Sequence, residues 1–168
     1  MNVLSLFDGM SCGRIALELA GIKVDNYYAS EIEKNAIKVS RDNYPEIIRL
    51  GSVEDWESWD IDWESIDMVI AGSPCQGFSY AGEQLAFDDD RSRLYFIFED
   101  IIKFAKPLYW FLENVRMKPE HINTISNRLG VEPVKINSSI VSAQNRVRYY
   151  WFNWENPEIQ NKNIELQN

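Results

Sequence analysis

Residues 68–79 read Met68-Val69-Ile70-Ala71-Gly72-Ser73-Pro74-Cys75-Gln76-Gly77-Phe78-Ser79, an apolar run followed by a loop with glycine and proline. Consecutive apolar residues bounded by turn-forming residues are typical of a short buried strand. In open α/β folds the ligand crevice lies outside the carboxyl ends of such strands. We therefore expect Cys75 to present its thiol at a sheet edge as a candidate nucleophile. A buried structural thiol is the alternative.

The rest of the chain repeats this alternation of strand-like and helical segments. A helix ended by Gly21 and helices over 34–43, 92–105 and 119–129 separate strands predicted at 2–7, 27–30, 47–50, 67–71 and 108–112. Strands that alternate with helices form parallel sheets. Two further strand-like runs, 131–141 and 147–152, predict a hairpin. The expected fold class is α/β, a doubly wound, mostly parallel sheet with helices on both faces that ends in an antiparallel hairpin.

A glycine-bearing loop follows the first predicted strand. Gly9 and Gly13 lack a Cβ, which allows a tight turn and close approach of a ligand to the next helix, and Ser11 can cap that helix. A purely structural turn explains these residues equally well. Glu31 favours a nucleoside-binding loop over a purely structural turn. Nucleoside-binding folds hold the ribose hydroxyls with an acid after the second strand, about twenty residues beyond such a loop. The sequence therefore predicts a nucleoside site, with Val53 placed to contact the adenine ring.

The charge of the chain limits its contacts with nucleic acid. The formal net charge is -9 and the sequence pI is about 4.7. Lys and Arg supply most non-specific affinity for phosphates, so the composition argues against a general polyanion binder and any contact with DNA must be local or assisted. Much of the acidity lies at 54–64, where we expect the acids on a solvated face and the interleaved tryptophans to anchor the packing.

Length and composition predict one catalytic domain over residues 1–155 and a polar tail at 156–168. Two cysteines and one histidine make neither a disulfide framework nor a metal cluster, so no metal is expected. That histidine, His121, is interpreted as a surface or satisfied side chain rather than a catalyst. No stretch has the length and apolarity of a membrane span or signal peptide, which predicts a soluble cytoplasmic protein.

Four motifs occur in the order seen in cytosine-C5 DNA methyltransferases, and the chain resembles that family along nearly its whole length. They are Phe7-Asp8-Gly9-Met10-Ser11-Cys12-Gly13, Gly72-Ser73-Pro74-Cys75-Gln76-Gly77-Phe78-Ser79, Glu113-Asn114-Val115 and Gln144-Asn145-Arg146-Val147-Arg148. Each is modestly specific alone, but together and in order they are hard to obtain by chance. The resemblance implies a Rossmann-like methyltransferase fold and DNA methylation, expected by analogy to belong to bacterial or phage restriction-modification.

The resemblance also implies a role for each catalytic residue. Cys75, on a turn fixed by Pro74, adds to C6 of cytosine, because C5 is too poor a nucleophile to accept a methyl group unaided. Glu113 holds the N3/N4 edge of the base and offers a proton as charge develops. Arg148, and less directly Arg146, stabilises the adduct through a fixed guanidinium. The base leaves the duplex stack beforehand.

S-adenosylmethionine is the cofactor that the resemblance implies. The positions expected to contact it are Phe7, Asp8, Gly9, Met10, Ser11, Gly13, Glu31, Ile32, Ser52, Val53, Ser73 and Pro74. Ser52 departs from the family pattern, which usually has an aspartate there to accept from the adenine amino group. Because a serine hydroxyl is a weaker acceptor, we expect lower cofactor affinity.

The chain also departs from the family at its end. Family members continue past Gln-x-Arg-x-Arg into a target-recognition region and a segment that completes the cofactor pocket, whereas only residues 149–168 follow Arg148. Three hypotheses follow: half of a split enzyme completed by a second chain, a minimal enzyme that holds DNA through self-association or a loop, and a catalytically weak or inactive, cofactor-binding regulatory subunit. A methyltransferase acting on RNA is a further alternative, because no duplex-gripping region is visible.

Overall fold

The computed structural model describes residues 1–72 and 90–158, with side chains from residue 94 in the second range. Its centre is a seven-stranded sheet in the order β3-β2-β1-β4-β5-β7-β6. The strands are β1 (Asn2–Leu6), β2 (Asn26–Ser30), β3 (Ile48–Gly51), β4 (Met68–Gly72), β5 (Tyr109–Val115), β6 (Val134–Asn137) and β7 (Val147–Phe152). The first five run parallel, and β7 lies antiparallel between β5 and β6. The predicted α/β fold with a final hairpin is therefore confirmed.

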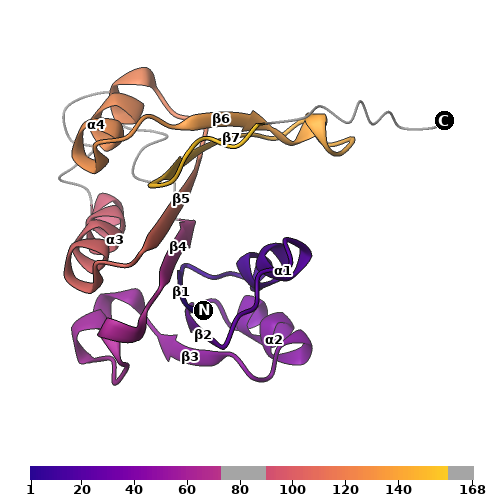
Figure 1. The fold of residues 1–168 in the computed structure, drawn as a ribbon, viewed down its shortest axis with the longest axis vertical. Helices are drawn as coiled ribbons and strands as arrows, with labels where there is room; N and C mark the ends of the chain where they lie inside the picture. Colours follow the sequence, from indigo (N-terminus) through magenta and orange to yellow (C-terminus); the bar gives the residue numbers. More distant parts are fainter. Residues whose placement is uncertain (73–89, 159–168) are drawn as a thin grey trace.

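Helices cover both faces of the sheet (Figure 1). They are α1 (Cys12–Leu19), α2 (Lys34–Asn43), α3 (Asp90–Ala105) and α4 (Pro119–Leu129). Figure 1 shows α1 and α2 on one side and α3 and α4 on the other. The reversal of strand order beside β1 places the ends of β1 and β4 next to each other, which is where doubly wound folds form their crevices.

Alternate residues of the central strands pack in two separate hydrophobic cores, one on each face of the sheet. Leu4 of β1 and Val69 of β4 face the larger core, which α3 and α4 close. Val3 and Ile70, one position away on the same strands, face the smaller core together with Leu17 of α1. This alternation follows from the two-residue period of a strand, and it explains why β1 and β4 are apolar along their whole length.

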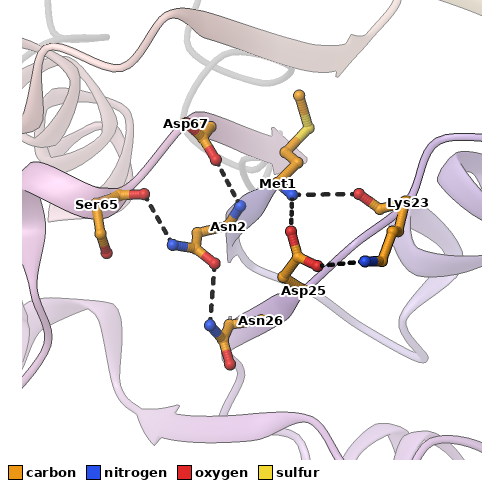
Figure 2. Close-up of polar contacts among 7 residues, drawn as sticks. All are labelled: Met1, Asn2, Lys23, Asp25, Asn26, Ser65 and Asp67. Atoms are coloured by element: carbon orange, nitrogen blue, oxygen red, sulfur yellow. Dashed lines mark hydrogen bonds and ion pairs between the residues drawn. The ribbon is translucent and has the colours of Figure 1, made fainter.

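Polar contacts tie together the amino ends of β1, β2 and β4 (Figure 2). The backbone N–H of Asn2 donates to Oδ2 of Asp67 at 2.7 Å, and Asn26 donates through Nδ2 to Oδ1 of Asn2 at 3.0 Å. The amino group of Met1 forms an ion pair with Asp25. These contacts fix the register of the three strands at one edge, so that their carboxyl ends also lie level at the other.

The tryptophan-rich stretch folds as the sequence indicates. It forms two 3₁₀ turns, η1 (Val53–Ser58) and η2 (Trp63–Ser65), whose acidic side chains are exposed. Trp59 is buried in the larger core, and the rings of Trp56 and Trp63 meet edge to face at 5.7 Å. The tryptophans are thus anchors that attach an acidic surface to the edge of α3.

The strand predicted over 131–141 is wrong in length. Within this stretch only residues 134–137, which form β6, pair with β7, and the chain then turns into the 3₁₀ segment η5 (Ser138–Ile140). Oδ1 of Asn137 accepts from the backbone N–H groups of Ser139 at 3.2 Å and Arg146 at 3.0 Å. Since a side-chain acceptor that binds backbone donors competes with the sheet ladder, Asn137 ends the strand.

Two smaller expectations concern His121 and membrane spans. His121 lies in α4 and is buried, so of the two expected environments the surface position is wrong. Among the helices of residues 1–72 and 90–158, none combines the length and apolarity needed to cross a bilayer.

Candidate active site

A cavity of about 290 Å³ opens at the carboxyl ends of β1, β4 and β5. Its lining includes Phe7, Asp8, Gly13, Gly72, Phe111, Glu113 and Arg146. All four motifs found in the sequence therefore border one space. The motif of Cys75 contributes Gly72, its last described residue.

The glycine loop and the acid after β2 are in direct contact. Gly9 has a φ of +60°, a conformation that favours glycine, and its N–H donates to Oε2 of Glu31 at 2.7 Å. Oε1 of Glu31 accepts from the backbone N–H groups of Ile32 and Glu33, both at 2.8 Å. A carboxylate offers about four acceptor positions, so Glu31 keeps capacity for a ligand hydroxyl. The structure thus brings together the two residues that predicted a nucleoside site.

Ser11 does not cap α1 as predicted. It has a φ of +64° and makes no side-chain bond to the first turn of that helix. Its hydroxyl instead donates to Oδ2 of Asp8 at 2.5 Å, and Tyr27 donates to the other oxygen of Asp8 at 2.7 Å. The left-handed backbone at Ser11 breaks the extended geometry that an N-cap needs to aim its oxygen at the helix.

Gly13 is required by packing. A Cβ at this position would lie 2.4 Å from Cδ1 of Ile70 and 2.9 Å from the hydroxyl oxygen of Tyr27. A methyl group here would therefore force the side chains of Ile70 on β4 and Tyr27 on β2 to move. This glycine holds the helix against the wall of the cavity.

Glu113 and Arg148 form an ion pair on adjacent strands. In the β5–β7 ladder Glu113 lies opposite Tyr150 and Val115 lies opposite Arg148, so the pair is diagonal on one face of the sheet. Nε of Arg148 is 2.7 Å from Oε1 of Glu113, without the alignment of a hydrogen bond. A second donor, Nη1, binds the carbonyl of Val147 at 2.8 Å. The guanidinium is thereby fixed beside the carboxylate, and both side chains are largely buried.

Tyr150 belongs to this group, although the sequence analysis missed it. Its ring lies 5.5 Å from that of Phe111. Burial, and then the charge of Glu113, raise the pKa of Tyr150, while Arg148 and Arg146 act in the opposite direction. The signal was present, because residues two apart on a strand share a face and Tyr150 follows Arg148 at that spacing.

Other predicted cofactor residues have diverse environments. Ile32 and Met10 are exposed, and the hydroxyl of Ser52 accepts from the N–H of Glu54 at 3.2 Å. Val53 is only 5% exposed and packs in the larger core, so it offers little surface to a ring. Arg146 is exposed at the cavity rim.

Ser73, Pro74 and Cys75 lie outside the described residues. The chain that leads to them begins at Gly72, which pairs in register with Glu113. A Cβ on Gly72 would sit 3.5 Å from Oε2 of Glu113. Gly72, the last described residue before the predicted nucleophile, therefore lies beside the predicted acid.

Comparisons with known proteins show the family of the chain. The sequence profile of the C-5 cytosine-specific DNA methylase family matches residues 1–167. Type II methyltransferase M.NgoBV of Neisseria gonorrhoeae is 38% identical over 68% of this chain and 28% of its own length. Type II methyltransferase M1.ScrFI of Lactococcus lactis subsp. cremoris is 32% identical over 95% of this chain and 43% of its own.

The fold also matches a solved structure. The crystal structure of a protein encoded within an E. coli prophage superposes with a TM-score of 0.68 and 27% identity, covering 90% of this chain and 46% of that one. The chain thus spans less than half the length of these relatives. Its profile match extends across the glycine loop, Glu31, Glu113 and Arg148, and the chain belongs to the C-5 cytosine-specific DNA methylase family.

Proposed function

We propose that this chain is the catalytic core of a methyltransferase that moves a methyl group from S-adenosylmethionine to C5 of cytosine in DNA. The observation that carries the proposal is the fixed Glu113–Arg148 pair, 2.7 Å apart, beside the strand end that leads to Cys75. A cytosine ring that is attacked at C6 must take up a proton, and the charge that develops on it must be stabilised. A carboxyl group can deliver the proton and a guanidinium can stabilise the charge when both are held at one edge of a pocket. Residues 1–155 form the core, and 156–168 form a tail.

Two pockets that share Asp8 suit an adenosine-bearing cofactor: the cavity of about 290 Å³, and a smaller pocket that Gly9 and Glu31 also line. Glu31 is held by three backbone N–H groups and keeps acceptor capacity for a ribose hydroxyl. The glycine loop contributes Phe7, Asp8, Cys12 and Gly13 to the lining of the cavity. When bound, S-adenosylmethionine supplies an electrophilic methyl group on a sulfonium centre. The chain's own contribution is to hold this group and the base in line.

The chemistry assigned to the residues is balanced. The Cys75 thiolate forms an S–C6 bond, and the electron pair displaced from the ring is met by a proton that Glu113 delivers at N3. C5 then takes the methyl group as the sulfonium–methyl bond breaks. Loss of the C5 proton to water returns the electrons that expel Cys75 as a thiolate, and N3 gives its proton back to Glu113. Arg148 keeps its charge throughout and stabilises the adduct.

DNA recognition requires surfaces beyond the core described above. The net charge of -9 leaves little capacity to neutralise phosphates, which supply most non-specific affinity. We propose that a second chain or a second copy of this one supplies the missing positive surface. The cytoplasm is the compartment where such an enzyme meets DNA in a bacterial cell.

Covalent trapping tests the proposal. The chain is mixed with S-adenosylmethionine and duplex DNA containing 5-fluorocytosine, whose fluorine blocks the final elimination, and adducts are separated by denaturing electrophoresis. An adduct in the wild type and in Cys12→Ser, but not in Cys75→Ser, is expected. An adduct that depends on Cys12, one that forms only with RNA, or none with any substrate would overturn the proposal.

A further inference from the structure

A continuous path of polar side chains runs behind the glycine loop. Tyr27 of β2 donates to Oδ1 of Asp8 at 2.7 Å, and Ser11 donates to Oδ2 of the same carboxylate at 2.5 Å. The hydroxyl oxygens of Ser11 and Ser40 are 2.6 Å apart. Nη2 of Arg49 lies 3.0 Å from the hydroxyl oxygen of Ser40. Four elements of the fold therefore meet through these side chains: β2, the loop, α2 and β3.

The hydrogens along this path can be assigned by counting. Each serine hydroxyl has one proton to donate. Ser11 gives its proton to Asp8, so Ser40 must donate to Ser11, and Ser40 in turn accepts from Arg49. The bonds therefore all point one way, from a guanidinium at one end to a carboxylate at the other. Chains of hydrogen bonds with this polarity strengthen one another in a buried setting.

Arg49 is a fixed starting point for the path. Nη1 binds the carbonyl of Ile47 at 2.8 Å, and Nη2 also binds the carbonyl of Tyr44 at 3.0 Å. These carbonyls lie in the turn between α2 and β3, so the guanidinium is anchored to backbone. Ser40, in turn, is buried on α2 at 3% exposed.

Ser11 is the residue that needs this support. It is fully buried and has a left-handed backbone with a φ of +64°, which L residues other than glycine and asparagine seldom adopt. Such strain persists only where the surroundings fix the conformation, and it gathers at functional sites. The bonds to Asp8 and Ser40 are the fixing contacts.

We propose that Ser40 and Arg49 are positioning residues for the glycine loop: they hold Ser11 in its left-handed conformation through the directed path. The link to cofactor binding rests on the proposed function. Neither residue lies in the motifs that identify the family. The path ends in the loop at Asp8, whose two carboxylate oxygens accept from Tyr27 and Ser11. These two bonds assign Asp8 to holding the conformation of the loop.

Amide hydrogen exchange in the whole chain tests the proposal without any ligand. Ser40→Ala is compared with Ser126→Ala, a matched control on α4 whose hydroxyl is equally buried and accepts from Trp151. Ser40→Ala is expected to speed exchange across residues 8–14 by roughly 3- to 10-fold, the fold-change for one lost hydrogen bond. Ser126→Ala should leave that segment unchanged. Equal loop exchange in the two variants would overturn the proposal.

Two substitutions at Ser11 separate a conformational role from direct ligand contact. Ser11→Ala loses both bonds and keeps the strain, whereas Ser11→Gly loses both bonds and removes it. Exchange in the loop should therefore rise more in Ser11→Ala than in Ser11→Gly, and the affinity for S-adenosylhomocysteine, measured by calorimetry, should fall in the same order. Equal effects of the two substitutions on loop exchange would contradict the proposal.

The same calorimetry distinguishes this inference from the proposed function. If the wild-type chain binds no S-adenosylhomocysteine, cofactor binding by the chain fails as a proposal. The exchange measurement still decides whether Ser40 and Arg49 position the loop. Arg49→Met serves as the second variant there, with the same expected rise in exchange over residues 8–14 and an unchanged loop as the contrary result.

Discussion

Oε1 of Glu113 lies 2.7 Å from Nε of Arg148, on strands β5 and β7 that α4 and β6 separate in the chain. The contact exists only because β7 returns to pair with β5. Neither residue can take its position through local structure. The relationship between them is therefore a sensitive indicator of whether the site is assembled.

Arg148→Lys should lower methyl transfer to DNA while leaving cofactor affinity nearly unchanged. A lysine ammonium cannot reproduce the planar guanidinium that contacts both Glu113 and the carbonyl of Val147. We expect a loss of about 10²- to 10³-fold, as for removal of one charge-stabilising donor. Labelled S-adenosylmethionine measures transfer, and calorimetry with S-adenosylhomocysteine measures affinity. Arg41→Lys, on the exposed side of α2, is the control; a parallel loss of affinity in Arg148→Lys would point to misfolding instead.

Gly13→Ala should destabilise the fold because the new methyl group would overlap Cδ1 of Ile70 at 2.4 Å. Overpacking of this kind costs about 1–3 kcal/mol. Urea unfolding followed by tryptophan fluorescence measures the loss. Ile70→Val removes the offending Cδ1, so the double variant should regain part of the stability. If the double variant is no better than the sum of the two single changes, the overlap is not the cause.

In Tyr27→Phe the free energy of unfolding should fall less steeply with rising pH in the alkaline range than it does in the wild type. Burial, followed by the charge of Asp8, raises the pKa of Tyr27 above its ordinary value of 10.0. Above pH 10 the unfolded chain loses this proton first, so the stabilising contribution is complete below pH 10 and declines as the pH rises. The slope removed is up to about 1.4 kcal/mol per pH unit. Unfolding between pH 8 and 11 measures it, with exposed Tyr109→Phe as control; equal slopes in wild type and Tyr27→Phe would refute the assignment.

Glu99→Gln should weaken the packing of α3 on α4 at neutral pH. Burial of Glu99 raises its pKa, but hydrogen bonds and charges from Arg128 and Lys103 outweigh this and hold the pKa below its usual value. Because the pKa of Glu99 is lower in the folded chain than in the unfolded chain, its ionised carboxylate stabilises the fold at pH values above the unfolded pKa. This stabilisation is lost as the pH falls through the pKa of the folded state.

Because both cationic partners of Glu99 are substantially exposed, the cost of Glu99→Gln is about 1–2 kcal/mol at pH 7. Denaturation at pH 7 and pH 3 measures it, and the difference from wild type should shrink at pH 3. A constant difference at both pH values would show that charge is not involved. Glu120→Gln, exposed at the start of α4, is the control.

Local signals in the sequence predicted most elements well. The helix over 34–43 was predicted with the bounds that α2 has, because Pro45 gives a clear stop. The contact between Gly9 and Glu31 also followed from a known relation between a loop and the next strand. Such features depend on a few neighbouring residues, and the sequence displays them directly.

Features set by distant side chains were harder to predict. The hydroxyl of Ser11 was expected to cap α1, but Asp8 and Ser40 compete for it, and Ser40 reaches it only once α2 has packed. Tyr150 escaped notice because its importance depends on lying opposite Glu113. Cys75 stays a prediction drawn from its motif and from its position after β4.

The position of β7 imposes an order on synthesis of the protein. A ribosome releases β1 to β5, which make up the parallel part of the sheet, before β6 and β7. β6 follows, but its described pairing partner is β7, which emerges later still. Throughout that interval Glu113 and the glycine loop are present without Arg148. A nascent chain can therefore form the contact between Gly9 and Glu31 well before Arg148 emerges, and the Glu113–Arg148 pair is a late event in its biogenesis.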